Sequence, residues 1–385
     1  MDHTLIIPTK NRPTWLYFSL NCLQKFGYKG KVIIVDGSNE AEHILNKNTF
    51  EKFKLLFNLE VIRELHDEKI RYTKINLSKY NIFKNKIETN FYSIMNDDDL
   101  FFPDFAKHGI KFLENNPDFS AITGIELNNY INNKFKVIKS FTRLYPEFLQ
   151  SDPLDRILHY STDQNQSLPI FGVCRTSIMK ELFEFENKYN FKPFCREKSG
   201  GLYSYDGEMP WQLHILINGK IKVTSSHLMY IRNRHNSPTR ESNLRFQKNH
   251  IAHMGPIELI KNDSLGNFVK EHLLELTFLI KNKSKYDDEI VEKVLNRIIW
   301  KFISREKGSG FHTEKTDYNT ELKNYRKDFK KITVSFPKIS KILSKNFLLQ
   351  IFNKFWDFGI NIKINILAKQ KYFVYKNLFK NFKRF

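Results

Sequence analysis

Three consecutive aspartates, Asp97–Asp99, form a cluster of acidic side chains with Asn96 directly before it. The cluster ends the apolar run Phe91–Met95. Adjacent carboxylates at the exposed end of a buried strand repel one another, and they suit a divalent cation with oxygen ligands. Mg²⁺ or Mn²⁺ held there could neutralise two phosphate groups. A solvated acidic turn that caps a helix beginning at Pro103 accounts for the same residues, and it is the simpler interpretation of the triplet alone.

A second acidic pair, Asp206 and Glu208, stands just before a predicted helix over Pro210–Leu216. A carboxylate in such a position can take a proton from a hydroxyl group. Acidic residues are also favoured in the first turn of a helix, because the helix dipole stabilises them. Both interpretations stay open at this point.

The apolar runs predict the elements that position these acids. Strands are expected over Thr4–Pro8, Lys31–Asp36, Leu59–Leu65 and Phe91–Met95, with helices beginning near Pro13, Glu40, Lys74 and Pro103. Alternating strands and helices are typical of a parallel α/β sheet. Ligands bind at the carboxyl ends of such strands. The position of the acidic triplet after a fourth strand therefore favours a binding site over an acidic turn.

The later part of the chain predicts a mixed pattern. We expect strands within 119–143, irregular loops over 151–194, a strand over Lys220–Ile231 and only helices beyond about Arg240. The predicted fold class is α/β, with a mostly parallel sheet flanked by helices and a C-terminal all-helical extension. The predicted domains are a catalytic domain over 1–240, with halves divided near 125, a helical extension over 241–334 and a tail over 335–385.

Composition limits the partners. The chain has 385 residues and a formal net charge of +20, which predicts a polyanionic neighbour: nucleic acid, an anionic membrane or a phosphorylated substrate. The cysteines Cys22, Cys174 and Cys195 are widely spaced and suggest neither a disulfide framework nor a zinc site. The N-terminus lacks the basic and long apolar regions of a signal peptide, so we expect a cytoplasmic protein.

Five segments together resemble the GT-A glycosyltransferases, specifically the large inverting group called family 2 and its bacterial surface-polysaccharide branch. The segments cover about residues 1–235 and stand in the family's order: TLIIPTKNRPTWL (4–16), VIIVDGS (32–38), NDDDLFFPD (96–104), ENNPDFSAITG (114–124) and YDGEMPWQLHILINGKI (205–221). The resemblance implies an enzyme that moves a sugar from a nucleotide-sugar donor to a hydroxyl group of a glycan or glycolipid acceptor.

The resemblance also implies where the donor binds. The candidate donor-binding residues are Pro8, Thr9, Arg12, Asp36, Arg71, Lys74 and Asp97. Pro8, Thr9 and Asp36 correspond to the base and ribose, and the basic residues to the diphosphate. For Asp36, a turn or helix-capping role explains the residue equally well.

In the same comparison the triplet takes the place of the metal-binding DXD motif. The motif fits either as Asn96-x-Asp98 or as Asp97-x-Asp99, because an asparagine stands at the usual first position. We predict Asp98 and Asp99 as ligands of a divalent cation, Mn²⁺ or Mg²⁺, with His235 as a further ligand from the loop after the last strand.

The catalytic and acceptor residues follow from the same resemblance. Related enzymes carry their general base in an acidic pair before a helix that ends in glycine, and counting back from Gly219 favours Glu208 over Asp206. Arg175 is the candidate contact for an anionic acceptor.

The tail alternates Lys with aromatic and aliphatic residues. This pattern is typical of amphipathic helices on an anionic membrane, so we expect a peripheral protein on the inner face of the cytoplasmic membrane. An ordinary helix packed on the catalytic domain explains the pattern as well.

Two other functions compete with sugar transfer. A sugar nucleotidyltransferase shares the sheet and a metal-binding aspartate, but its phosphate loop is rich in glycine, whereas Pro8–Pro13 contains none. A nucleic-acid-binding protein would explain the charge, but no RNP, zinc-finger or helix-turn-helix pattern occurs. We therefore expect no nucleic-acid partner.

Overall fold

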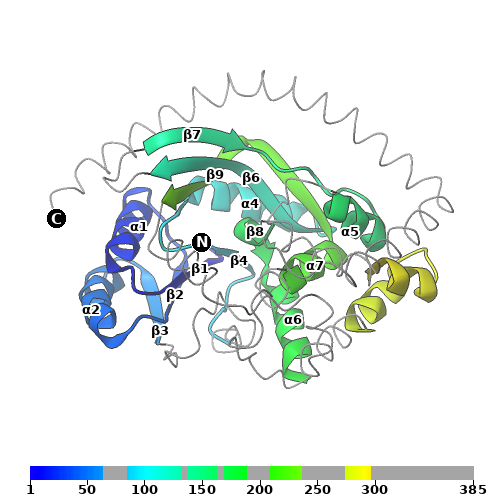
Figure 1. Ribbon diagram of the computed structural model, residues 1–385, viewed down its shortest axis with the longest axis horizontal. Coiled ribbons are helices and arrows are strands. Elements are labelled where there is room, and N and C mark those ends of the chain that lie inside the picture. The colour runs from blue at the N-terminus through cyan, green and yellow to red at the C-terminus, as the bar shows by residue number, and fades with distance from the viewer. Residues whose placement is uncertain (64–84, 132–136, 163–168, 189–208, 236–273, 296–385) are drawn as a thin grey trace, which may run out of the picture.

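The computed structural model describes residues 1–63, 85–131, 137–162, 169–188, 209–235 and 274–295 (Figure 1). These residues form a mixed sheet in the order β3-β2-β1-β4-β8-β6-β9-β5, with β7 paired to β6. The predicted class, α/β with a mostly parallel sheet flanked by helices, is confirmed.

The first half of the sheet is parallel. It consists of β1 (His3–Thr9), β2 (Lys31–Asp36), β3 (Asn58–Arg63) and β4 (Phe91–Ile94). β1, β2 and β4 are almost entirely buried, which explains their continuous apolar sequences. The register pairs Thr9 with Asp36 and Asp36 with Arg63, so the carboxyl ends of three strands lie side by side.

Two helices pack beside this half, as Figure 1 shows in blue. α1 (Pro13–Lys25) begins at a proline, buries Leu16, Leu20 and Leu23, and is followed by Gly27, whose φ of 73° suits glycine. α2 (Glu40–Lys54) is capped by the Asn39 side chain, which accepts a hydrogen bond from the Glu42 N–H group.

The second half mixes directions. Its elements are β5 (Leu100–Phe101), α4 (Pro103–Asn115), β6 (Phe119–Ile131), β7 (Val137–Arg143), β8 (Val173–Arg175) and β9 (Lys220–His235). β8 is antiparallel to β4 and β6, whereas β6 and β9 are parallel to each other. β6 and β9 therefore run in the same direction as β1–β4, and their carboxyl ends lie at the same edge of the sheet.

The expectation of irregular loops over 151–194 was wrong. The structure has α5 (Pro153–Thr162), a short 3₁₀ helix (Pro169–Phe171), β8 and α6 (Thr176–Lys188) there, and α7 (Met209–Asn218) follows. Buried Arg156 in α5 donates hydrogen bonds to the carbonyl groups of Leu216 and Ile217 at the end of α7. A buried arginine interrupts the apolar periodicity of α5, which hid that helix in the sequence.

The described part of the C-terminal extension is helical over 274–281 and 288–295. Its turn packs on α5, where Asp152 accepts hydrogen bonds from the Lys285 N–H group and the Ser284 hydroxyl, and Asp155 pairs with Lys285. The predicted boundaries near 240 and 334, and the tail over 335–385, lie outside the described residues.

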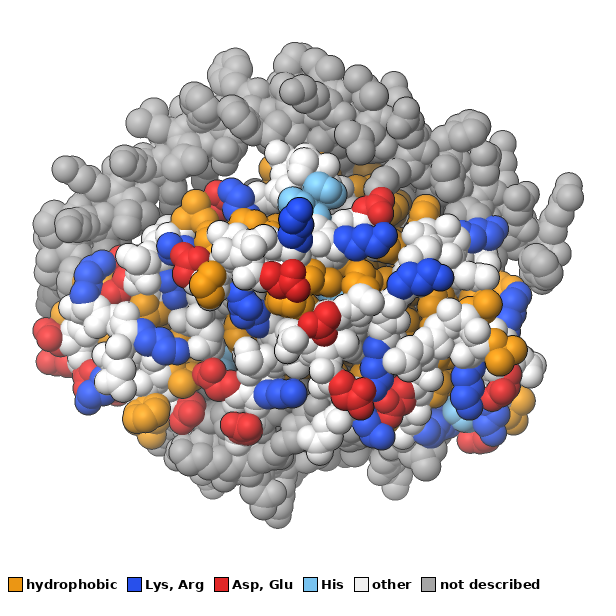
Figure 2. All heavy atoms as spheres, turned by 180° about the vertical axis from the view of Figure 1, so that it is seen from behind, with side chains coloured by type: hydrophobic (Ala, Val, Ile, Leu, Met, Phe, Trp, Pro, Cys, Tyr) orange, Lys and Arg blue, Asp and Glu red, His pale blue; other side chains and the backbone are white. Residues whose placement is uncertain are grey.

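Charges are mixed on the surface that the structure describes. Figure 2 shows acidic and basic side chains interspersed on the face opposite that of Figure 1. Among the described residues, no helix has both the length and the apolar character needed to span a bilayer.

Candidate functional site

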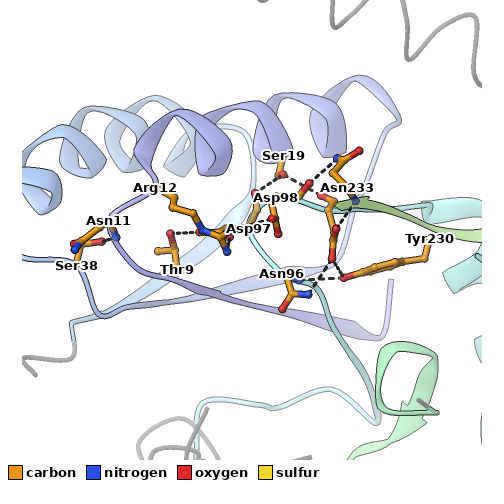
Figure 3. Close-up of polar contacts among 11 residues, drawn as sticks. Thr9, Asn11, Arg12, Ser19, Ser38, Asn96, Asp97, Asp98, Tyr230 and Asn233 are labelled. Atoms are coloured by element: carbon orange, nitrogen blue, oxygen red, sulfur yellow. Dashed lines mark hydrogen bonds and ion pairs between the residues drawn. The ribbon is translucent and has the colours of Figure 1, made fainter. Parts of the chain in front are cut away.

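The acidic triplet lies at the carboxyl edge of the sheet, after β4 and beside the ends of β1 and β9 (Figure 3). β4 has a parallel neighbour, β1, on one side and an antiparallel neighbour, β8, on the other. In the order β3-β2-β1-β4 the strands that follow β1 are added first on one side of it and then on the other. The triplet therefore lies at a topological switch point, which is where open α/β sheets bind ligands.

Arg12 bridges two of the three carboxylates. Its Nη1 donates to Asp98 Oδ2 at 2.8 Å and its Nε donates to Asp97 Oδ2 at 3.2 Å, while Nη2 forms an ion pair with Asp97 Oδ1. The Thr9 hydroxyl adds a 2.7 Å hydrogen bond to Asp97 Oδ2. The side chain of Asp97 is fully buried, so the guanidinium compensates a charge that water cannot reach.

Asp99 ties β4 to β9. Its Oδ2 accepts hydrogen bonds from Asn96 Nδ2 at 2.9 Å and the Tyr230 hydroxyl at 2.8 Å, and its Oδ1 accepts one from the Asn233 N–H group at 2.8 Å. Asp99 is 1% exposed. Both of its oxygens are therefore engaged inside the protein.

The backbone of the triplet is held from two sides. The Ser19 hydroxyl of α1 lies 2.7 Å from the Asp97 carbonyl oxygen and 2.9 Å from that of Asp99, and Asn233 Nδ2 donates to the Asp98 carbonyl at 2.6 Å. These contacts fix the turn regardless of what its side chains bind. Ser19, Tyr230 and Asn233 were not identified from the sequence, since no local pattern distinguishes them.

Burial raises the pKa of two aspartates of the triplet, Asp97 and Asp99. It raises the pKa of Asp97 to about 7, although Arg12 opposes the shift. It likewise raises the pKa of Asp99 to about 7, with a further contribution from the charge of Asp98. Burial acts to lower the pKa of Arg12, but Asp97 and Asp98 outweigh it and the pKa rises. Burial and mutual repulsion therefore make ionisation of Asp97 and Asp99 less favourable, and Arg12 opposes this effect at Asp97.

Asp98 differs from its neighbours in accessibility. Its side chain is 13% exposed, compared with none for Asp97. Within the residues that the structure describes, no three His, Cys, Asp or Glu side chains are grouped so that they could hold a metal ion alone. Mg²⁺ in phosphate-binding sites is typically held by one or two carboxylates together with substrate phosphates. Asp98 fits that kind of site, whereas Asp99 is fully engaged with protein donors.

Asp36 sits at the end of β2 and is completely buried. Its carboxylate accepts hydrogen bonds from the Ser38 N–H group at 2.9 Å, from Asn46 Nδ2 at 3.2 Å and from His43 Nδ1 at 2.7 Å. Burial acts to raise its pKa, but these hydrogen bonds outweigh it and the pKa is lowered. This set of partners is that of a turn aspartate, and a donor contact by Asp36 stays a prediction.

The loop before Arg12 is anchored to the β2–α2 loop. Asn11 has a φ of 55°, and it is the only non-glycine residue with positive φ among the described residues. Its N–H group donates to Ser38 Oγ at 2.9 Å, and its Oδ1 accepts from the Asn39 N–H group at 2.8 Å. Asparagine tolerates this backbone region better than most residues. The loop can therefore present Arg12 from a fixed backbone.

Two further arginines lie at this edge of the sheet. Arg63, at the end of β3, contacts the Ser38 carbonyl at 2.5 Å and lies 3.9 Å from Asp36 Oδ1. Arg232, near the end of β9, lies 3.8 Å from Glu126 Oε2 and stacks over Phe171 at 4.8 Å.

Arg175 lies elsewhere. It pairs with Phe91, the first residue of β4, so it stands at the opposite end of that strand from the triplet. Its guanidinium donates to the carbonyl groups of Leu113 and Asn116 at the end of α4 and to that of Phe119 at the start of β6. This placement gives Arg175 a structural role and separates it from the candidate site, so its predicted acceptor contact gains no support.

The other predicted residues are described only in part. Pro8 lies within β1, next to Thr9. His235 was expected in a loop after the last strand, but it is the last residue of β9. Its side chain is not described. Four predicted site residues lie outside the described ranges: Arg71, Lys74, Asp206 and Glu208.

Comparisons with known proteins add structural similarities. No protein-family model and no curated protein sequence matches the chain. The solved structure of S. aureus TarS 1-349 with UDP-GlcNAc matches at a TM-score of 0.48 with 17% identity, covering 81% of this chain and 75% of that chain. The structure of the mannosyltransferase PcManGT from Pyrobaculum calidifontis, with GDP-Man and Mn²⁺, matches at a TM-score of 0.39 with 10% identity. The match covers 80% of this chain and 88% of that chain.

The raised pKa values predict how stability changes with pH. Folded Asp97 and Asp99 keep protons up to about pH 7, whereas unfolded aspartate releases them near pH 4. Between these values the folded state binds more protons, so the free energy of unfolding should fall as pH rises. We expect the melting temperature to decrease from pH 5 to pH 8, and Asp99→Asn to reduce that decrease.

Thermal denaturation at several pH values measures this effect. Asp104→Asn is the matched control, because it removes an exposed carboxylate from the first turn of α4 and should leave the pH dependence unchanged. Parallel curves for the wild type and Asp99→Asn would contradict the prediction.

Proposed function

We propose that this protein is a glycosyltransferase that moves a sugar from a nucleotide-sugar donor to a hydroxyl group of a glycan or lipid-linked glycan. One observation carries the proposal: the acidic triplet at the end of the fourth parallel strand contacts Arg12, and Asn11, which precedes Arg12, is hydrogen-bonded to Ser38 in the loop that follows β2. The sequence motifs that resemble family 2 fall on these same elements.

The strand ends suggest how the donor lies. The β2–α2 loop, with Asp36 and Ser38 next to Arg63, offers polar groups for a nucleoside. Arg12 stands between that loop and the triplet, and its guanidinium suits a diphosphate. A divalent cation would be held by Asp98, and when bound it neutralises the charge that develops on the departing diphosphate. The accessibility of Asp98 favours the Asn96-x-Asp98 register of the motif.

The chemical step needs a base near the acceptor. In an inverting reaction a carboxylate takes the proton of the acceptor hydroxyl as its oxygen forms a bond to the anomeric carbon. The bond from that carbon to the diphosphate oxygen breaks, and the nucleoside diphosphate leaves. Glu208 is our candidate because it belongs to an acidic pair directly before α7, and Gly219 follows the last residue of that helix, as in the family that the sequence resembles.

The first test concerns the donor and the cation. UDP-, GDP-, CMP- and TDP-sugars are screened with Mn²⁺ by thermal shift, since a bound ligand raises the melting temperature. We then expect Asp98→Asn to reduce release of the nucleoside diphosphate on the order of 10²- to 10³-fold, as for loss of other electrostatic groups. The fold should persist, because the Asp98 side chain is partly exposed. EDTA should stop turnover and added Mn²⁺ should restore it.

Asp104→Asn serves again as the control and should retain full turnover. If the wild type turns over undiminished in EDTA, the cation has no role in the reaction.

The second test concerns the base. Glu208→Gln should reduce turnover by about 10² to 10⁴ while donor binding persists, because it removes only the proton acceptor. Asp206→Asn is the paired variant. NMR of the product should give an anomeric configuration opposite to that of the donor. A retained configuration would rule out single displacement, and an active Glu208→Gln beside an inactive Asp206→Asn would transfer the role to Asp206.

The tail is proposed to bind an anionic membrane at its cytoplasmic face. Residues 335–385 contain eleven Lys and Arg and one Asp, which is half of the formal net charge of +20. Deleting them should leave transfer to a soluble acceptor analogue largely unchanged and should abolish sedimentation with phosphatidylserine vesicles at physiological salt. Continued sedimentation of the truncated protein would assign membrane binding to another part, and binding to DNA instead would revive the nucleic-acid alternative.

A further inference from the structure

The Arg12 guanidinium lies directly against two carboxylates of the acidic triplet. All three guanidinium nitrogens face Asp97 or Asp98, through Nε, Nη1 and Nη2. The contact to Asp98 is the important one, since Asp98 is the only carboxylate of the triplet with a partly exposed side chain. A divalent cation that approached Asp98 would be repelled by the Arg12 guanidinium, which is already hydrogen-bonded to Asp98 Oδ2.

We propose that Arg12 is a specificity residue that keeps divalent cations off Asp98 until a diphosphate arrives and takes the guanidinium. This inference rests on the proposed function, because it assigns Arg12 to the diphosphate of the donor.

The chemistry of the two partners explains the exchange. A diphosphate offers a guanidinium several charged oxygens, and such charge-assisted hydrogen bonds are strong and often bidentate. When Arg12 turns to the diphosphate, it gives up its hydrogen bond to Asp98 at the moment when phosphate oxygens become available as further cation ligands. Cation and diphosphate should therefore bind cooperatively, each strengthening the other by the same factor.

The local structure permits a side-chain movement without a loop movement. Asn11 fixes the backbone before Arg12 through its contacts with Ser38 and Asn39, and α1 begins directly after it at Pro13. The Arg12 side chain is nevertheless 29% exposed, so it has a route to solvent and to a ligand at the sheet edge. Thr9 stays behind as a hydrogen-bond donor to Asp97 when Arg12 leaves.

Removing the guanidinium should have opposite effects on the two ligands. Arg12→Gln should bind Mn²⁺ alone more tightly than the wild type, by roughly 5- to 150-fold if the coupling is of ordinary size. It should bind inorganic pyrophosphate alone more weakly. The expected sign for Mn²⁺ rests on geometry, because Arg12→Gln removes the guanidinium that is hydrogen-bonded to Asp98 Oδ2 in the wild type.

Two binding measurements on the full chain test this without any sugar donor. Loss of the free Mn²⁺ signal in electron paramagnetic resonance gives the cation affinity, and calorimetry in EDTA gives the pyrophosphate affinity. Lys10→Gln is the matched control, because it removes one positive charge from the same loop. It should change both affinities much less. Adding Asp98→Asn to Arg12→Gln should abolish the gain in Mn²⁺ affinity.

Several outcomes would overturn the proposal. One is a wild type that binds Mn²⁺ alone as tightly as Arg12→Gln, and another is equal gains in Arg12→Gln and Lys10→Gln. A variant that loses both ligands with an unchanged melting temperature would also count against it. Arg12→Lys keeps the charge and covers the case in which Arg12→Gln does not fold. Its Mn²⁺ affinity should lie between those of the wild type and Arg12→Gln. Failure of sugar transfer with the expected Mn²⁺ result would refute the proposed function and leave the role of Arg12 toward diphosphate standing.

Discussion

The ion pairs between Arg12 and two adjacent buried carboxylates organise the centre of this protein. Removing Asp97 from water is unfavourable, and the like charge of Asp98 adds to the cost. A single guanidinium placed between two carboxylates offsets much of that cost. It can do so only if the β1–α1 loop and the end of β4 meet, so the position of one side chain constrains two segments that lie 85 residues apart.

The same charge requirement explains why the second half of the sheet docks where it does. Asp99 needs donors, and it obtains them from Tyr230 and Asn233 of β9. β9 enters this position through its long parallel pairing with β6, while β8 separates β6 from β4. The parallel half and the mixed half therefore share one polar centre in addition to a hydrophobic core. A ligand at this centre would contact groups from both halves.

The sequence predicted those features that arise from local patterns. The apolar runs of β1, β2 and β4 and the proline-initiated helices α1 and α4 all came from periodicity and helix-start signals. The triplet's position at a strand end followed from them. The partners of the triplet did not, because Ser19, Tyr230 and Asn233 are ordinary residues whose role depends on distant pairing. The place of Arg175 depends on distant pairing in the same way, since its strand runs antiparallel to β4 and carries it to the far end. Its acceptor contact stays a prediction.

At this site the backbone is held by hydrogen bonds, whereas the Arg12 side chain is partly exposed. Ser19 and Asn233 hold the carbonyl groups of the triplet, and Asn11 holds the loop in a left-handed conformation that other residues adopt less readily. Arg63 holds the β2–α2 loop to which Asn11 is attached. Hydrogen bonds thus hold both loops together. Under the proposed function, a donor would reach the triplet through the Arg12 guanidinium, which contacts two of the carboxylates and is 29% exposed.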